Sequence, residues 1–314
     1  MPLTLPPPCD SGRRHRAAEC QFSRRVFVGS RDCRFANTLG RRYRVFVVDD
    51  GWEEPSTTEH NMDKVEQIFD QLDDWRHLPT YQLERRADIF FSLYLREILE
   101  SCTGTEIHEV VVPEFPLRKG TLRKMGNDGK GQNQSYRADY LALSSDLNQA
   151  FLIELKTDRG SSRQVQRLYL KNASHVGFER LVDGLLDVFR ATKSKRKYFC
   201  LLKKMEAIGL ISGLGSMEQA MANQERIDGF SEALDEIVVA ETDPTVSLVC
   251  IHPEDSPSTR KDNNGNSDEN IFVHWISFSK VMEIVGKHSD PLSQRFARSL
   301  REWLENPAGR RVSG

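Results

Sequence analysis

The stretch RADYLALSSDLNQAFLIELKTD, from Arg137 to Asp158, decides how this chain is expected to fold. Two short apolar runs, Tyr140–Leu143 and Phe151–Leu155, flank a polar segment, which is the pattern of a β-hairpin. If the turn lies at Ser145–Asn148, residues whose numbers sum to 293 face each other across the two strands. The hairpin therefore fixes which side chains of the two strands meet.

Three charged side chains gather at one end of this hairpin. In the expected register Asp139 lies opposite Glu154, and Lys156 shares the face of Glu154 because side chains alternate along a strand. Hard divalent cations bind oxygen ligands, so Asp139 and Glu154 are candidate ligands for Mg²⁺, with Mn²⁺ as a substitute. The alternative is a solvated surface pair, since Glu and Lys two residues apart on a strand are commonly exposed. Both faces of the hairpin are otherwise apolar, which favours the metal site.

An Asp followed on the next strand by Glu-x-Lys resembles the motif of the PD-(D/E)xK nuclease superfamily, carried here by Asp139, Glu154 and Lys156. The flanking segments are also similar, because Leu83–Ser101 resembles the first core helix of the family and His108–Leu117 its first strand. The resemblance implies an α/β fold over residues 62–314, with a mixed central sheet flanked by helices in a restriction-endonuclease-like core.

The resemblance also implies an activity, the metal-dependent hydrolysis of phosphodiester bonds by an endonuclease or exonuclease, with DNA as the favoured partner. Charge builds on the phosphoryl oxygens in this reaction, and a bound Mg²⁺ neutralises it and lowers the pKa of a bound water. Lys156 would orient the attacking water or stabilise the transition state. Glu84, near the start of the first helix, is the candidate for a further ligand, and Glu97 competes with it. As a first-turn residue, Glu84 would equally complement the helix dipole.

A helix is expected from near Arg163, and its start would lie at the mouth of the site. It resembles the Gln-rich helix that follows the motif in many of these nucleases. Gln164, Gln166 and Tyr169 are therefore the candidate substrate-binding residues, since helix N-termini favour phosphate. In this arrangement Leu168 packs inward. Each Gln is equally well explained as a solvated helix residue.

Two other functions compete with catalysis. The chain could be a degenerate nuclease fold that serves as a non-catalytic module binding nucleic acid or a protein partner, or an ordinary scaffold without a site. The presence of Asp139, Glu154 and Lys156 argues against degeneration. The motif is compatible with endonuclease or exonuclease action and with a monomer or a homodimer.

The first part of the chain, residues 1–61, differs in composition from the rest. It is rich in proline and arginine, lacks lysine and shows no sustained helical or strand period, so we expect it to be largely disordered. The alternatives are a basic arm that binds nucleic acid and a true start at Met62 instead of Met1. Within this part, Arg41–Asp50 is the segment with some strand character.

Overall composition bounds the class of protein. The 314 residues carry a net charge of -2 and 38% hydrophobic residues, and no apolar run has membrane-spanning length. The six cysteines show no zinc spacing and no disulfide pattern, which predicts a reducing, cytoplasmic setting without a membrane partner. His175 and His252 are expected to be structural or surface residues.

Outside the motif the sequence predicts further elements and two basic segments. The basic residues within 118–136 and 193–204 suit either phosphate contact or a solvated surface. Residues 212–230 predict a linker or a short helix. The other expected elements are helices over Met62–Trp75, Phe178–Phe189 and Ser293–Glu305, and strands over Thr245–Pro253 and Asn270–Phe278. In the first of these helices the expected apolar face is made of Val65, Ile68, Phe69 and Leu72.

The first core helix has an expected apolar stripe and a candidate cap. The stripe consists of Leu83, Ala87, Phe90, Tyr94 and Ile98, and Thr80 could cap the helix.

Overall fold

The computed structural model describes residues 57–78, 81–122, 132–158, 164–223, 227–256 and 271–307. Side chains are described from Lys64 onward within the first of these ranges. The disorder expected before Met62 and the strand expected over Arg41–Asp50 fall almost entirely outside the described residues. They stay predictions.

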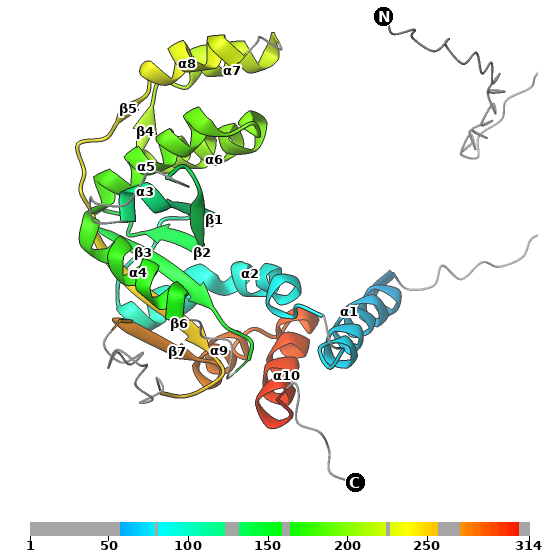
Figure 1. Ribbon diagram of the computed structural model, residues 1–314. Coiled ribbons are helices and arrows are strands. Elements are labelled where there is room, and N and C mark those ends of the chain that lie inside the picture. Colours follow the sequence, from blue (N-terminus) through cyan, green and yellow to red (C-terminus); the bar gives the residue numbers. More distant parts are fainter. Residues whose placement is uncertain are drawn as a thin grey trace, which may run out of the picture. The chain divides into compact units, whose positions relative to one another are not determined.

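Within the described residues, five strands form a mixed central sheet in the order β1-β2-β3-β6-β7. Strand β2 (Ser135–Leu143) is antiparallel to both of its neighbours, β1 (Val112–Arg118) and β3 (Gln149–Leu155). Strands β6 (Thr245–His252) and β7 (His274–Ser277) follow in parallel with β3. Figure 1 shows helices packed around this sheet, so the predicted α/β class with a mixed sheet is confirmed.

The register of the central hairpin is the predicted one. Tyr140 pairs with Ile153 and Leu143 with Ala150, and both pairs sum to 293. The turn closes where Ser144 N donates to Gln149 O at 3.0 Å. A slip by one residue would have moved every apolar side chain of the hairpin to the other face, so two buried faces fix this register strongly.

Each face of the sheet packs against its own set of helices. One face joins the core built with α4 (Gln164–Val176) and α5 (Phe178–Ala191), as expected for the apolar stripe of Phe178–Phe189. The other face joins the core built with α2 (Glu84–Thr103), α9 (Phe278–Val285) and α10 (Pro291–Glu305). The hairpin side chains on these faces are Leu141, Leu143, Ala150 and Leu152 on the first, and Tyr140, Ala142, Phe151, Ile153 and Leu155 on the second.

The remaining elements lie around these two layers. Residues 212–230, expected to be a linker or short helix, contain one complete helix and the start of another. These elements are α1 (Thr57–Trp75), α3 (Lys119–Leu122), α6 (Lys195–Ile208), α7 (Gly215–Ala222) and α8 (Ile227–Asp235), with a small hairpin of β4 (Ile211–Ser212) and β5 (Val238–Val239). Among the described residues, no helix combines the length and apolar character needed to cross a membrane.

Two helix predictions need correction in detail. Helix α1 begins at Thr57, before Met62, and Ile68 is 50% exposed although it was expected on the apolar face. In α2 the N-cap is Leu83, and no side chain caps the helix. Its buried stripe contains Phe91 in place of the expected Phe90, because the stripe is rotated by about one residue around the axis.

Helix α1 is attached to α10 through a charged cluster. Arg295, which is 4% exposed, makes ion pairs with Glu66 at 2.8 Å, Asp70 at 2.8 Å and Asp73 at 2.9 Å. Trp303 donates its indole N–H to Asp73 at 2.6 Å. Breaking a buried ion pair by removing one partner is costly, so α1 is an integral part of the domain.

The two edges of the sheet differ in composition. Strand β1 forms one edge and carries Pro113 and Pro116, which lack a backbone N–H. Strand β7 forms the other edge and has 4 residues. The charged end of the hairpin lies inside the sheet, on β2 and β3.

Candidate metal centre

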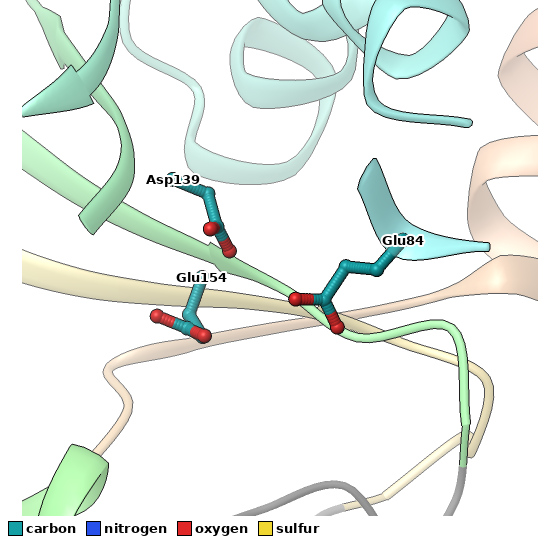
Figure 2. Close-up of side chains that lie close together, drawn as sticks. All are labelled: Glu84, Asp139 and Glu154. Atoms are coloured by element: carbon teal, nitrogen blue, oxygen red, sulfur yellow. The ribbon is translucent and has the colours of Figure 1, made fainter. Parts of the chain in front are cut away.

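Three carboxylates meet at the end of the hairpin. One oxygen from each of Glu84, Asp139 and Glu154 lies within 4.8 Å of the other two. Figure 2 shows the three side chains converging from the first residue of α2, from β2 and from β3. The site is therefore built jointly by the sheet and by the start of a helix that covers one of its faces.

The local geometry of β2 changes where Asp139 stands. Ala138 and Leu141 belong to the same core, so the alternation of faces is interrupted between them. On the neighbouring strand Glu114 has φ 53, a conformation that non-glycine residues seldom adopt. Beyond the last regular pair of the hairpin, the Asp139 carboxylate accepts the backbone N–H of Leu155 at 2.7 Å. This bond aims Asp139 at the space beside Glu154.

Lys156 lies among the three carboxylates. Its ammonium is hydrogen-bonded to Glu154 and lies 3.8 Å from Glu84. Burial of this side chain lowers its pKa, but Glu154, Glu84 and Asp139 outweigh that effect, and the net pKa lies above the usual value. Lys156 is therefore charged at neutral pH and is held in place.

The carboxylates are difficult to ionise together. Burial, with a smaller contribution from Asp139, raises the pKa of Glu154 to about 8. Burial also raises the pKa of Glu84 to about 7, although Lys156 opposes the shift. The pKa of Asp139 is raised by burial, against the hydrogen bond from Leu155 and the charge of Lys156. The single positive charge of Lys156 does not balance the negative charge that the three carboxylates would carry if all of them were ionised.

The arrangement fits a hard divalent cation. Glu154 is 1% exposed, and its Oε2 atom is buried without a hydrogen-bond partner, while Oε1 accepts two bonds. A buried carboxylate oxygen without a partner is costly, and a cation would satisfy it. Mg²⁺ is usually bound by one or two carboxylates together with waters and substrate phosphate oxygens, and this group of three acids can supply the carboxylates.

Glu97, the other candidate on the first helix, lies elsewhere. Its carboxylate is 2.7 Å from Nε2 of His288 and is not part of the acidic cluster. Between the two alternatives, the structure places Glu84 beside Asp139 and Glu154.

Helix α4 contributes Gln166 to the site. Its side-chain amide donates to Oε1 of Glu154, the oxygen that also accepts from Lys156. The side chain of Gln164 lies outside the described residues, so its predicted role stays a prediction. Gln166 thus binds a candidate metal ligand, a contact that the sequence alone did not indicate.

Two other predictions on α4 have different outcomes. Tyr169 is 8% exposed, its hydroxyl donates to Arg137 O at 3.0 Å, and its ring stacks on Tyr136 at 4.3 Å. Contact between Tyr169 and a substrate remains a prediction. The inward packing of Leu168 is wrong, since this residue is 58% exposed. The buried face of α4 runs instead through Tyr169, Leu170 and Ala173, and Leu168 lies off that face.

Further side chains border the site on β6 and β7, the strands that follow β3 in the sheet. Glu154 pairs with Cys250, and Cys250 with Trp275, so the three residues form one row across parallel strands. With His252, whose ring lies tilted against that of Trp275 at 4.6 Å between the ring centres, they line a cavity of about 10 Å³, enough for about one water molecule. His252 is 3% exposed and accepts the backbone N–H of Glu254, in agreement with a structural role. Sequence reasoning missed this row because the pairing of distant parallel strands has no local signal.

Comparison of the chain with models of protein families, with curated proteins and with solved structures finds no match in any of the three. The function of this protein is therefore inferred from the geometry and chemistry of the site.

Proposed function

We propose that this protein is a metal-dependent nuclease that hydrolyses phosphodiester bonds, with DNA as the favoured substrate. The observation that carries the proposal is the convergence of Glu84, Asp139 and Glu154 around the ammonium of Lys156. These are the residue types that phosphodiester hydrolysis requires, because carboxylates hold the cation and an ammonium offsets charge on the phosphate.

The order of elements supports the proposal. Helix α2, strand β1, the β2–β3 hairpin and helix α4 follow one another as in the nuclease family that the motif resembles. The mixed sheet also agrees with a restriction-endonuclease-like core. We therefore extend the resemblance from the short motif to the surrounding fold.

Each side chain has a definite part in the proposed reaction. Asp139, Glu154 and Glu84 would hold Mg²⁺, which when bound supplies a Lewis acid and a water of lowered pKa. Lys156 is fixed by Glu154 and Glu84, so its ammonium is already oriented toward the oxygens of an arriving phosphate. Gln166 holds Glu154 in its orientation, as partners of metal ligands commonly do.

A non-catalytic binding module explains the site less well. Removing two or more charges from water is costly, and the buried residues Glu154 and Lys156 bear that cost together with the neighbouring acids. A module that only binds nucleic acid needs basic surface residues and gains nothing from carboxylates, which repel phosphate.

Calorimetry with Mn²⁺ and a cleavage assay on labelled DNA test the proposal together. The wild-type protein should bind Mn²⁺ and cleave DNA, and Glu154→Gln should do neither. Glu97→Gln is the matched control, because it removes the same charge from a carboxylate outside the cluster. Wild-type metal binding by Glu154→Gln, or loss of binding by Glu97→Gln, would contradict the assignment.

A further inference from the structure

A second hollow lies beyond the start of β2. It is a cleft of about 650 Å³ between the β1–β2 end, the last turn of α5 and the first turn of α6. The lining includes Lys119, Gln132, Gln134, Thr192 and Tyr198. Its volume lies in the range of sites that bind small molecules or parts of larger ligands.

The cleft offers one fixed cation and no acidic side chain among the described residues that line it. Lys119 donates to the side-chain oxygen of Gln134 at 2.9 Å and lies 4.8 Å from the ring centre of Tyr136. The ammonium is therefore held in place before any ligand arrives, which lowers the entropy lost on binding. Around it, the amide and hydroxyl groups can donate and accept hydrogen bonds.

An acidic residue on α5, the helix that lines one side of the cleft, is compensated by ion pairs. Asp187, on the last turns of α5, is paired with Arg118 at 3.1 Å and Arg190 at 3.3 Å. The C-terminal end of α5 would itself repel an anion, because its last carbonyls carry partial negative charge. Lys195, which is 9% exposed, donates to Phe189 O at 2.5 Å and Arg190 O at 2.9 Å and so offsets that charge. The cleft is thus suited to a phosphate.

The cleft is connected to the metal centre through aromatic side chains. Lys119 lies over Tyr136, Tyr136 stacks on Tyr169, and Tyr169 stands on the helix that carries Gln166. Along β2, Ser135 at the cleft and Asp139 at the centre are separated by roughly 13 Å, at about 3.3 Å per residue. The rise of about 3.4 Å per nucleotide is measured along the duplex axis, and because the strand also winds around that axis, a straight distance of this size spans only about two nucleotides of one strand.

We propose that this cleft binds the substrate strand at a nucleotide about two positions from the cleaved bond, with Lys119 on its phosphate. The inference rests on the proposed nuclease function. Tyr198 and the amide side chains at the cleft contact the sugar and base of the same nucleotide. The cleft thus holds the strand in register while the metal centre acts on it.

The test is a scan with oligonucleotides that each carry one uncharged methylphosphonate in place of a phosphate. Binding is measured by fluorescence anisotropy without divalent metal, and the cleaved bond is mapped separately with Mg²⁺. For the wild-type protein, affinity should fall roughly tenfold when the substitution lies about two nucleotides from the cleaved bond. Lys119→Ala should bind the unmodified strand with the same loss and should not respond to that substitution. Its salt dependence should fall by about one phosphate contact.

Lys280→Ala is the matched control, because Lys280 is a partly exposed lysine of α9 that pairs with Glu283 and lies outside the cleft. It should keep the wild-type response at every position. If the protein cleaves DNA and Lys119→Ala responds to the scan as wild type does, the cleft proposal is overturned and the nuclease function stands. If nothing is cleaved but binding still depends on Lys119, the cleft holds nucleic acid and the nuclease function falls. If a free mononucleotide displaces the labelled oligonucleotide as effectively as an unlabelled oligonucleotide does, the cleft is a nucleotide site. Its proposed role in holding the strand is then overturned.

Discussion

Glu154 is the residue on which the chemistry of the centre depends most directly. It is 1% exposed and lies next to Asp139, and burial raises its pKa from the ordinary value of 4.5 to about 8. At neutral pH the folded protein therefore binds a proton that the unfolded chain releases. For an acid whose pKa is raised by folding, stability is highest below the pKa of the unfolded chain. It declines as pH rises from that value to the pKa of the folded protein.

The metal-free protein should therefore become less stable between about pH 5 and pH 8. Bound metal reverses the trend, because ligands must lose their protons before they bind a cation. Thermal unfolding at a series of pH values, with and without Mn²⁺, measures both slopes. Glu154→Gln should flatten the metal-free slope, and an unchanged slope in that variant would assign the proton to another group.

Lys156 gives a second prediction at the same scale. Lys156→Met should abolish cleavage while Mn²⁺ affinity stays close to wild type, because an ammonium does not ligate a cation. The variant should also lose about 3 kcal/mol of metal-free stability, since buried carboxylates lose their compensating charge. Calorimetry, single-turnover cleavage and urea unfolding measure these three quantities. Cleavage at the wild-type rate would remove Lys156 from the mechanism.

Some positions in the site could be predicted from the sequence, and others depended on how distant elements pack. The register that joins Asp139 to Glu154 was predictable, because a short turn and two apolar faces permit one pairing. The choice between Glu84 and Glu97 was not, since both lie on one helix and only the crossing of that helix over the sheet separates them. The row from Glu154 to Trp275 depends on pairing between β3, β6 and β7, which local patterns do not encode.

At the scale of elements, helix α4 links the sheet to the mouth of the site. Gln166 donates to the same Glu154 oxygen as Lys156, so its removal frees a ligand to rotate. Gln166→Ala should therefore weaken Mn²⁺ binding roughly tenfold as well as cleavage, as loss of a partner to a metal ligand commonly does. A residue that contacts only the substrate would leave the Mn²⁺ affinity unchanged.

Calorimetry on Gln166→Ala, with Gln166→Glu as a variant that adds charge, separates the two roles. Leu168→Ala is the control, because its side chain is 58% exposed on the same helix. Unaltered metal affinity in Gln166→Ala, combined with weaker substrate binding, would show that Gln166 acts on the substrate and not on Glu154.

Helix positions and types were predictable, but the faces of helices were less so. Leu168 and Ile68 are large apolar residues that the structure leaves exposed. A helical period defines a stripe only to within about one residue, and apolar residues are common on protein surfaces. Phe90 and Phe91 illustrate the same ambiguity. Both are neighbours on α2, and the sequence alone does not determine which of them is buried against the sheet.

For the whole molecule, the attachment of α1 sets where the chain can be shortened. Glu66, Asp70 and Asp73, which pair with Arg295, all follow Met62. A chain that starts at Met62 should fold, and its melting temperature should lie within a few degrees of the full chain, since surface changes of about 0.5 kcal/mol shift it little.

A chain that starts at Tyr81 provides the contrast. It lacks Phe69 and Leu72, which pack in the same core as Phe296 and Trp303, and it leaves Arg295 without its acidic partners. Soluble yield and thermal unfolding of both chains test the prediction. A collapse of the Met62 chain would show that residues before it contribute to the fold.

The composition of the sheet edges bears on how copies of this protein can associate. A second sheet joins an edge by continuing its ladder of backbone hydrogen bonds, and this is also how fibrous aggregates grow. Pro113 and Pro116 interrupt the donors along β1, and β7 is only 4 residues long before α9 begins. Within the described residues, neither edge of the central sheet offers a long, uninterrupted ladder of backbone groups. Copies of the folded domain should therefore resist strand-by-strand polymerisation through these two edges at high concentration.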